Sequence, residues 1–179
     1  MAHGKSGAHA GAASRRAGSR RVLFICAANT ARSIIAEHLL RRELHARGAA
    51  DSIEIRSAGI APYARDGALV SLDTRFALRD HGLELTDEKT STDLRRNLHL
   101  LEEAALVLAM TREQREIVER MPQAAGKPVY TLREYAGEED GDIADPATRD
   151  ESFFRSTCAI IKQALELALP RLLASAAAR

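Results

Sequence analysis

A cysteine and a nearby arginine are the residues of this chain best suited to covalent chemistry. Cys26 and Arg32 enclose a run of small and polar residues, and Ser33 follows directly. A thiol at a helix N-terminus and beside a guanidinium favours the thiolate, which is a good nucleophile toward phosphorus. Arginine can also bind two phosphate oxygens at once, which lysine cannot do. The spacing therefore predicts a phosphate site that carries its own nucleophile, and a hydrogen bond from Ser33 to the sulfur further favours the thiolate.

The elements on either side of this run explain how such a site forms. Residues 22–25 (Val-Leu-Phe-Ile) predict a buried strand, and apolar residues recur at helical spacing from Ser33 onward, with Glu37 and Arg41 on the solvent side. A strand that turns directly into a helix leaves backbone N–H groups unpaired, and these groups and the helix dipole attract anions. Successive amides of the turn can form a nest for phosphate oxygens. The phosphate-binding residues predicted in the turn are Ala27, Ala28, Asn29, Thr30 and Ala31.

A second group must supply a proton, because attack on a phosphoester expels an oxygen or nitrogen leaving group. The candidate is Asp145, which precedes Pro146 in the acidic loop at 135–150. Proline restricts the backbone of the residue before it and stiffens the loop. Asp140 and Asp142 are alternatives by composition alone. We therefore predict that Asp145 reaches the leaving group from outside the phosphate nest.

The remaining sequence alternates predicted strands and helices. The run at 104–109 (AALVLA) is continuously apolar, which is typical of a strand buried on both faces of a parallel sheet. Thr111 and Gln114 predict a capping box at the start of the next helix. Tyr63 lies in the loop after the second strand, where ligands bind in open parallel sheets, and it is the aromatic residue best placed to line a pocket mouth. The alternation predicts a single-domain α/β fold, a parallel sheet with helices on both faces. The predicted strands are 22–25, 52–57, 104–109 and 128–132, and the predicted helices are 33–47, 68–79, 93–99, 111–121 and 151–173.

The composition excludes several classes of protein. The chain has 179 residues, of which 45% are hydrophobic, so it can build the core of one domain. Its formal net charge of +1 and its aromatic content of 4% do not favour a nucleic-acid binder. No run is long and apolar enough to span a membrane, and no membrane partner is expected.

The ends of the chain and its cysteines suggest where the folded part lies and where it works. Residues 1–20 contain no acidic residue and no large apolar residue except Met1, so we expect a disordered tail ahead of a folded domain at 21–179. Cys26 and Cys158 do not indicate a disulfide framework. A reactive thiolate suits a reducing compartment, so we expect a cytoplasmic protein.

The stretch VLFICAANTARS, with AEHLL after it, resembles the phosphate loop of the low-molecular-weight protein tyrosine phosphatases, and the resemblance runs from Arg21 to about Leu173. It implies four parallel strands with the phosphate loop after the first, and an enzyme that needs neither cofactor nor metal. Cys26 would form a thiophosphate intermediate, and Asp145 would act as the general acid. Ser57 would hold Asn29, a residue type that tolerates the left-handed conformation. The implied partners are phosphorylated proteins, and no feature specifies an oligomeric state.

The chain departs from the family pattern at several positions. Ala28 stands in place of Gly, and a positive φ there would cost about 1–2 kcal/mol. Ala147 replaces the aromatic residue that usually follows Asp-Pro, which weakens the argument for an aromatic substrate. Ala31 and Ile34 stand in place of Cys and Pro.

Our prediction is a phosphatase of phosphotyrosine-type monoesters, with three alternatives. Thr30 occupies a position where arginine-directed relatives carry threonine, which indicates a protein arginine phosphatase as the nearest alternative. An arsenate reductase uses a similar loop but needs partner thiols, and Cys158 lies on an apolar stripe. The departure at Ala28 motivates the third, an inactive phosphate-loop protein that binds phosphorylated partners.

Overall fold

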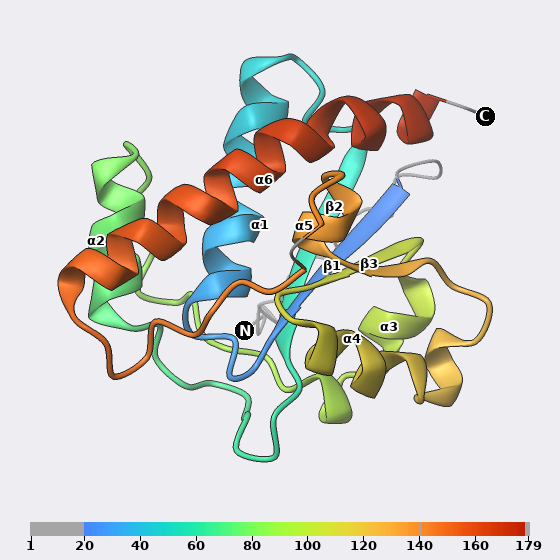
Figure 1. Cartoon of the computed structure of the whole chain (residues 1–179), viewed down its shortest axis with the longest axis horizontal. Helices are drawn as coiled ribbons and strands as arrows, with labels where there is room; N and C mark the ends of the chain where they lie inside the picture. The colour runs from blue at the N-terminus through green and yellow to red at the C-terminus, as the bar shows by residue number, and fades with distance from the viewer. Residues whose placement is uncertain (1–19, 140, 178–179) are drawn as a thin grey trace, which may run out of the picture.

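The computed structural model describes residues 20–139 and 141–177, and a four-stranded parallel sheet forms its centre (Figure 1). The strand order is β2-β1-β3-β4, and the strands are β1 (Arg20–Cys26), β2 (Ile53–Gly59), β3 (Leu106–Ala109) and β4 (Val129–Thr131). The predicted fold class is confirmed. The expected tail lies outside the described residues except for Arg20, which begins β1.

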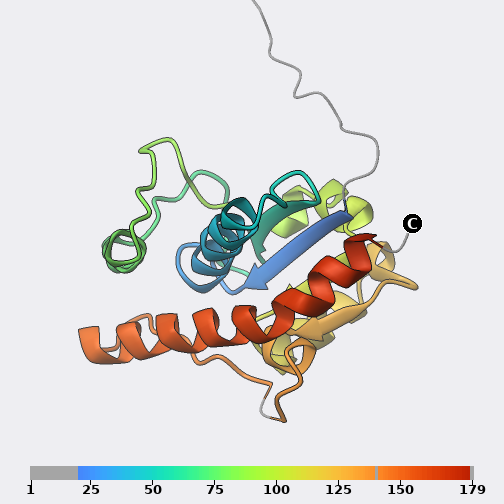
Figure 2. The ribbon, with the colours of Figure 1, turned by 90° about the horizontal axis from the view of Figure 1, so that it is seen from above.

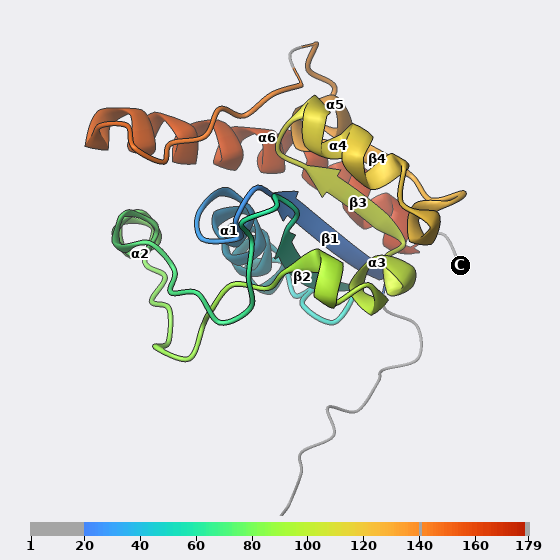
Figure 3. The same cartoon turned by 90° about the horizontal axis from the view of Figure 1, so that it is seen from below.

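Helices cover both faces of the sheet (Figures 1 and 3). One face packs against α1, α5 and α6, and the other packs against α3 and α4. The helices are α1 (Arg32–Ala46), α2 (Leu72–Asp80), α3 (His99–Glu103), α4 (Arg112–Glu119), α5 (Leu132–Tyr135) and α6 (Glu151–Ala177), with short 3-10 turns η1 (Leu94–Arg96) and η2 (Pro122–Ala124). None of the helices in the described ranges has the length and the apolar character that crossing a membrane requires.

The central strand β1 holds the two halves of the core together. Val22 and Phe24 pack with α1 and α6, whereas Leu23 and Ile25 point to the opposite face. All four side chains are fully buried because both faces of the strand are covered, which explains why this strand reads as a continuous apolar run. Cys26 is the last residue of this buried strand, so its position at the end of the sheet is held by the packing of the core.

Helix boundaries differ from the predicted ones where side chains cap the backbone. The second helix begins at Leu72 because the Ser71 hydroxyl accepts the Thr74 N–H at 3.2 Å. The predicted capping box at Thr111 is only half formed, since Gln114 Oε1 is buried with no hydrogen-bond partner in the described part of the chain. A complete box at the end of β4 instead starts the unpredicted helix α5. The predicted helix at 93–99 is divided into η1 and α3.

A half-buried histidine on α1 makes stability depend on pH. Burial lowers the pKa of His38 to about 4, Glu37 opposes this shift, and Arg41 and Lys89 add to it. Its Nε2 has no hydrogen-bond partner among the described residues. The unfolded chain, with a histidine pKa of about 6.5, therefore binds more protons than the folded chain between pH 6.5 and 4. The contribution is complete above pH 6.5 and is lost as the pH falls toward the folded pKa.

We expect His38→Gln to flatten the pH dependence of the free energy of unfolding across this window. Urea denaturation at pH 7, 6, 5 and 4 measures it, and the difference between variant and wild type removes the contributions of acidic residues. His45→Gln, on the same helix but exposed, is the matched control. Parallel curves for wild type and His38→Gln would contradict the assignment.

Candidate active site

The turn between β1 and α1 has the backbone form that a phosphate loop needs. Asn29 adopts the left-handed conformation with φ of 58°. Ala28 is not among the described residues with positive φ, so the strain that an alanine would suffer there does not arise. The N–H groups of Ala28, Thr30 and Ala31 donate to no other atom of residues 20–139 and 141–177. These groups are free to bind an anion.

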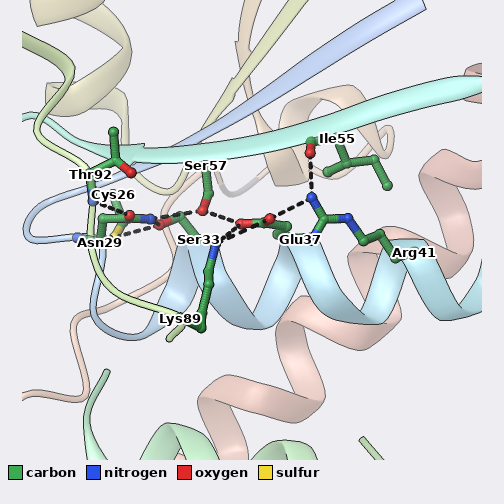
Figure 4. A network of polar contacts seen from close by, with 9 residues as sticks. All are labelled: Cys26, Asn29, Ser33, Glu37, Arg41, Ile55, Ser57, Lys89 and Thr92. Atoms are coloured by element: carbon green, nitrogen blue, oxygen red, sulfur yellow. Dashed lines mark hydrogen bonds and ion pairs between the residues drawn. The ribbon is translucent and has the colours of Figure 1, made fainter. Parts of the chain in front are cut away.

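Asn29 is fixed by three neighbours behind the loop (Figure 4). Its Oδ1 accepts the Thr92 N–H at 2.8 Å, which sets the orientation of the amide. Its Nδ2 then donates to Ser33 Oγ at 2.8 Å and to Ser57 Oγ at 2.9 Å. The hydrogen bond expected between Asn29 and Ser57 is present.

The sulfur of Cys26 is buried and is held by two polar groups. It accepts the Asn29 N–H at 3.2 Å and lies 3.0 Å from Ser33 Oγ. Because the Ser33 oxygen already accepts from Asn29, its single hydrogen is available to the sulfur. One backbone N–H and one hydroxyl are therefore directed at Sγ.

The hydrogen bonds that run from Cys26 through Ser33, Asn29 and Ser57 end on Glu37. Glu37 was expected on the solvent side of α1, but its side chain is only 2% exposed. The loop before α3 covers it and brings Lys89 within 3.0 Å, while Arg41 lies 2.7 Å away (Figure 4). Burial alone would raise the pKa of Glu37, but these two charges and the Ser57 hydroxyl outweigh burial and hold the pKa below its usual range. The charged carboxylate accepts the Ser57 hydroxyl and so orders the chain that supports the loop.

Cys26 opens into a cleft with a volume of about 130 Å³. Arg32 lies on its wall, almost fully buried, and donates to the Ile143 carbonyl oxygen at 2.8 Å. Its other terminal nitrogen pairs with Asp145 at 2.5 Å. The predicted site residues that line this cleft are Cys26, Ala28, Thr30, Ala31, Arg32, Tyr63, Asp145 and Pro146.

The loop before α6 brings Asp145 to the cleft. Ile143 is buried and anchors the loop, since its N–H donates to the Met110 carbonyl oxygen at 2.8 Å. Asp142, an alternative acid by composition, instead accepts the Arg112 N–H at the start of α4. The other alternative, Asp140, lies outside the described residues.

Some predicted residues lie away from the cleft, and others were missed. The Ala27 carbonyl oxygen faces the end of β2 and accepts the N–H groups of Ile60 and Ala61. Asn29, Ser33 and Ser57 are buried behind the loop. The cleft residues that the sequence did not indicate are Ser71, Asp73, Thr148 and Phe154.

The sequence of residues 21–177 matches the family model for low molecular weight phosphotyrosine protein phosphatase. The chain belongs to this family. A protein-arginine-phosphatase of Geobacillus stearothermophilus is 36% identical over 70% of this chain and 78% of that protein. The low molecular weight protein-tyrosine phosphatase A of Mycobacterium bovis is 29% identical over 80% of this chain and 86% of that protein. The solved structure of the YwlE arginine phosphatase from Geobacillus stearothermophilus superimposes with a TM-score of 0.75 at 30% identity, covering 87% of this chain and 94% of that chain.

Gly59 packs against the phosphate loop more closely than any side chain could. A Cβ there would lie 2.7 Å from the Ala28 carbonyl carbon and 2.8 Å from the Ala27 carbonyl oxygen. We expect Gly59→Ala to displace the loop and to lower kcat/KM of this family's phosphatase reaction at least about tenfold, at a stability cost of about 1–3 kcal/mol. Steady-state kinetics beside chemical denaturation separates the two effects. Wild-type kinetics in the variant would show that the loop does not depend on this contact.

Proposed function

We propose that this chain dephosphorylates proteins through a thiophosphate enzyme formed on Cys26. The sulfur attacks phosphorus, and the bond from phosphorus to the leaving oxygen or nitrogen breaks. Water then attacks the thiophosphate and releases phosphate and the free thiolate. The observation that carries the proposal is the meeting of Cys26, Arg32 and Asp145 at one cleft, with two donors on the sulfur. The reducing environment of the cytoplasm suits such a thiol.

Arg32 and the loop amides stabilise the charge that builds on the phosphate oxygens. The guanidinium presents a planar pair of donors, and a phosphate that binds it competes with Asp145 for these donors. Asp145 is then free to face the leaving group. In the first step it gives a proton to that group, and in the second it removes a proton from water. Arg32 supplies a positive charge and the amides supply N–H donors, so the proposed mechanism needs no metal or cofactor.

Phosphotyrosine-type monoesters are the first candidate substrates. The family description names phosphotyrosine, and the Mycobacterium bovis relative is named a protein-tyrosine phosphatase. Tyr63 is 69% exposed and lines the mouth of the cleft, where it can pack on a substrate ring. Turnover of p-nitrophenyl phosphate tests the proposal, and binding without turnover would identify an inactive phosphate-loop protein instead.

Phosphoarginine is the second candidate, and specific features favour it. Thr30 lines the cleft and offers a hydroxyl, and the carboxylates of Asp73 and Asp145 line the same cleft, which suits a guanidinium. Two named relatives, including the one at 36% identity, are protein-arginine-phosphatases. Arsenate reduction is less well supported, because burial raises the pKa of Cys158 and this thiol does not line the cleft.

We expect Thr30→Ile to shift substrate choice toward phosphotyrosine about tenfold, which is about 1.4 kcal/mol of differential transition-state binding. The substitution keeps the branched shape but removes the hydroxyl that can contact a guanidinium. The ratio of kcat/KM for phosphoarginine and phosphotyrosine peptides measures the shift. An unchanged ratio would mean that Tyr63 and the Asp145 loop select the substrate.

A further inference from the structure

A groove adjoins the cleft that contains Cys26. Helix α2 and the first turns of α6 enclose a groove of about 260 Å³. Asp73 and Phe154 line both this groove and the cleft that contains Cys26. Figures 1 and 2 show α2 set out beside the N-terminal end of α6, beyond α1. A substrate whose phosphorylated residue enters the cleft can therefore extend into the groove without leaving the protein surface.

The groove combines apolar walls with acidic groups. Phe76 is 49% exposed, and the guanidinium of Arg79 lies over its ring, 5.0 Å from the ring centre. Ala77 and Phe154, both buried, complete the apolar part. The charged lining residues are three acids, Asp73, Asp80 and Glu151, and one base, Arg155.

Two of these acids are available to a ligand. Glu151 pairs with Arg155 one helical turn further along α6, so the charges of these two side chains offset each other. Neither Asp73 nor Asp80 forms an ion pair within the described part of the chain. The groove therefore offers two carboxylates beside exposed aromatic surface.

We propose that this groove binds a lysine or arginine side chain of the substrate protein, close in sequence to the phosphorylated residue. The inference rests on the proposed phosphatase function. The aliphatic stem of a basic residue packs on the exposed part of Phe76, and its cationic head pairs with Asp80. A neutral or acidic side chain lacks the pairing, and an acidic one is repelled.

The spacing of the two carboxylates sets the distance between the substrate residues. Asp73, at the cleft, and Asp80 lie on one helix, where the rise of 1.5 Å per residue separates them by about 10 Å. An extended peptide advances about 3.3 Å per residue, so a basic residue three positions from the phosphorylated residue spans this distance.

The experiment compares phosphopeptides that differ at one position. Each carries the phosphorylated residue that the enzyme hydrolyses, with arginine, norleucine or glutamate three positions away, on the N-terminal or the C-terminal side. We expect kcat/KM for the arginine peptide to exceed that for the norleucine peptide about fivefold on one side, as an exposed ion pair allows. The preference should decline as salt rises from 50 mM to 500 mM, because salt screens such pairs.

Two variants assign the preference to the groove. Asp80→Asn should reduce the arginine-to-norleucine ratio to about two or less, and Asp80→Lys should make glutamate preferred over arginine. Because the ratio compares two substrates of one variant, general effects on activity or folding cancel. Glu102→Gln, an exposed acid on α3 at the far end of the sheet, is the matched control and should keep the wild-type ratio (Figure 1).

The outcomes separate the inference from the function on which it rests. A wild-type protein that hydrolyses p-nitrophenyl phosphate and all peptides with a ratio near one would overturn the inference and leave the phosphatase intact. Equal rates for norleucine and arginine peptides, both above glutamate, would show an apolar groove with no role for its carboxylates, which also overturns it. Absence of turnover with every phosphate compound would overturn both.

Discussion

Cys26→Ser is expected to remove turnover of p-nitrophenyl phosphate, a loss of about 10⁵-fold or more. The serine hydroxyl is similar in size to the thiol and can accept the same Asn29 N–H, but it has no comparable anionic form at neutral pH. Without an anion, the attack on phosphorus loses its nucleophile. Stopped assays with enzyme at micromolar concentration measure the residual rate.

The remaining cysteine provides the matched control. Cys158 is buried in α6 and does not line the cleft, and burial raises the pKa of its thiol. Cys158→Ser should therefore keep the wild-type kcat while it lowers stability, because a hydroxyl replaces an apolar packing group. Cys26→Ser should unfold near the wild-type denaturant concentration and still bind inorganic phosphate. Substantial turnover by Cys26→Ser would assign the nucleophile to another residue.

The sheet and the phosphate loop could be predicted because their signals are local. The apolar run at 22–25, the small residues after Cys26 and the helical spacing from Ser33 lie within one short stretch of chain. The left-handed conformation of Asn29 agrees with a requirement that only a few residue types meet. Its bond to Ser57 on β2 was expected from the family resemblance alone, because it joins two separate elements.

The surroundings of the loop could not be predicted, because they depend on contacts between distant segments. Glu37 has a charged side chain at an apparently exposed position of α1, but Ser57 from β2 and Lys89 from a distant loop pack against it, and it is buried. Asp73 lies in the first turn of α2 and lines the cleft, and this position depends on how α2 packs against the rest of the molecule. Phe154 belongs to the apolar stripe of α6. From the sequence, its position in the walls of the cleft and of the neighbouring groove could not be distinguished from ordinary core packing.

Asp145→Asn is expected to slow a poor leaving group far more than a good one. Loss of general acid catalysis typically costs 10²–10⁴-fold, so phenyl phosphate should lose activity by about that factor. p-Nitrophenolate leaves without a proton, so p-nitrophenyl phosphate should lose about tenfold or less. The asparagine cannot give up a proton, and it also removes the negative partner of Arg32, which leaves the guanidinium free for phosphate. Steady-state kinetics with both esters measures the two losses.

The control for this variant is Asp142→Asn in the same acidic loop. Asp142 contacts Arg112 at the start of α4 and not the cleft, so its replacement should affect both esters equally and by less than about threefold. Only a residue that protonates the leaving group makes the loss depend on the basicity of that group, whereas a residue that merely shapes the loop slows all substrates together. Equal losses for the two esters in Asp145→Asn would therefore move the general acid to another carboxylate of the cleft, and Asp73 is the one that lines it.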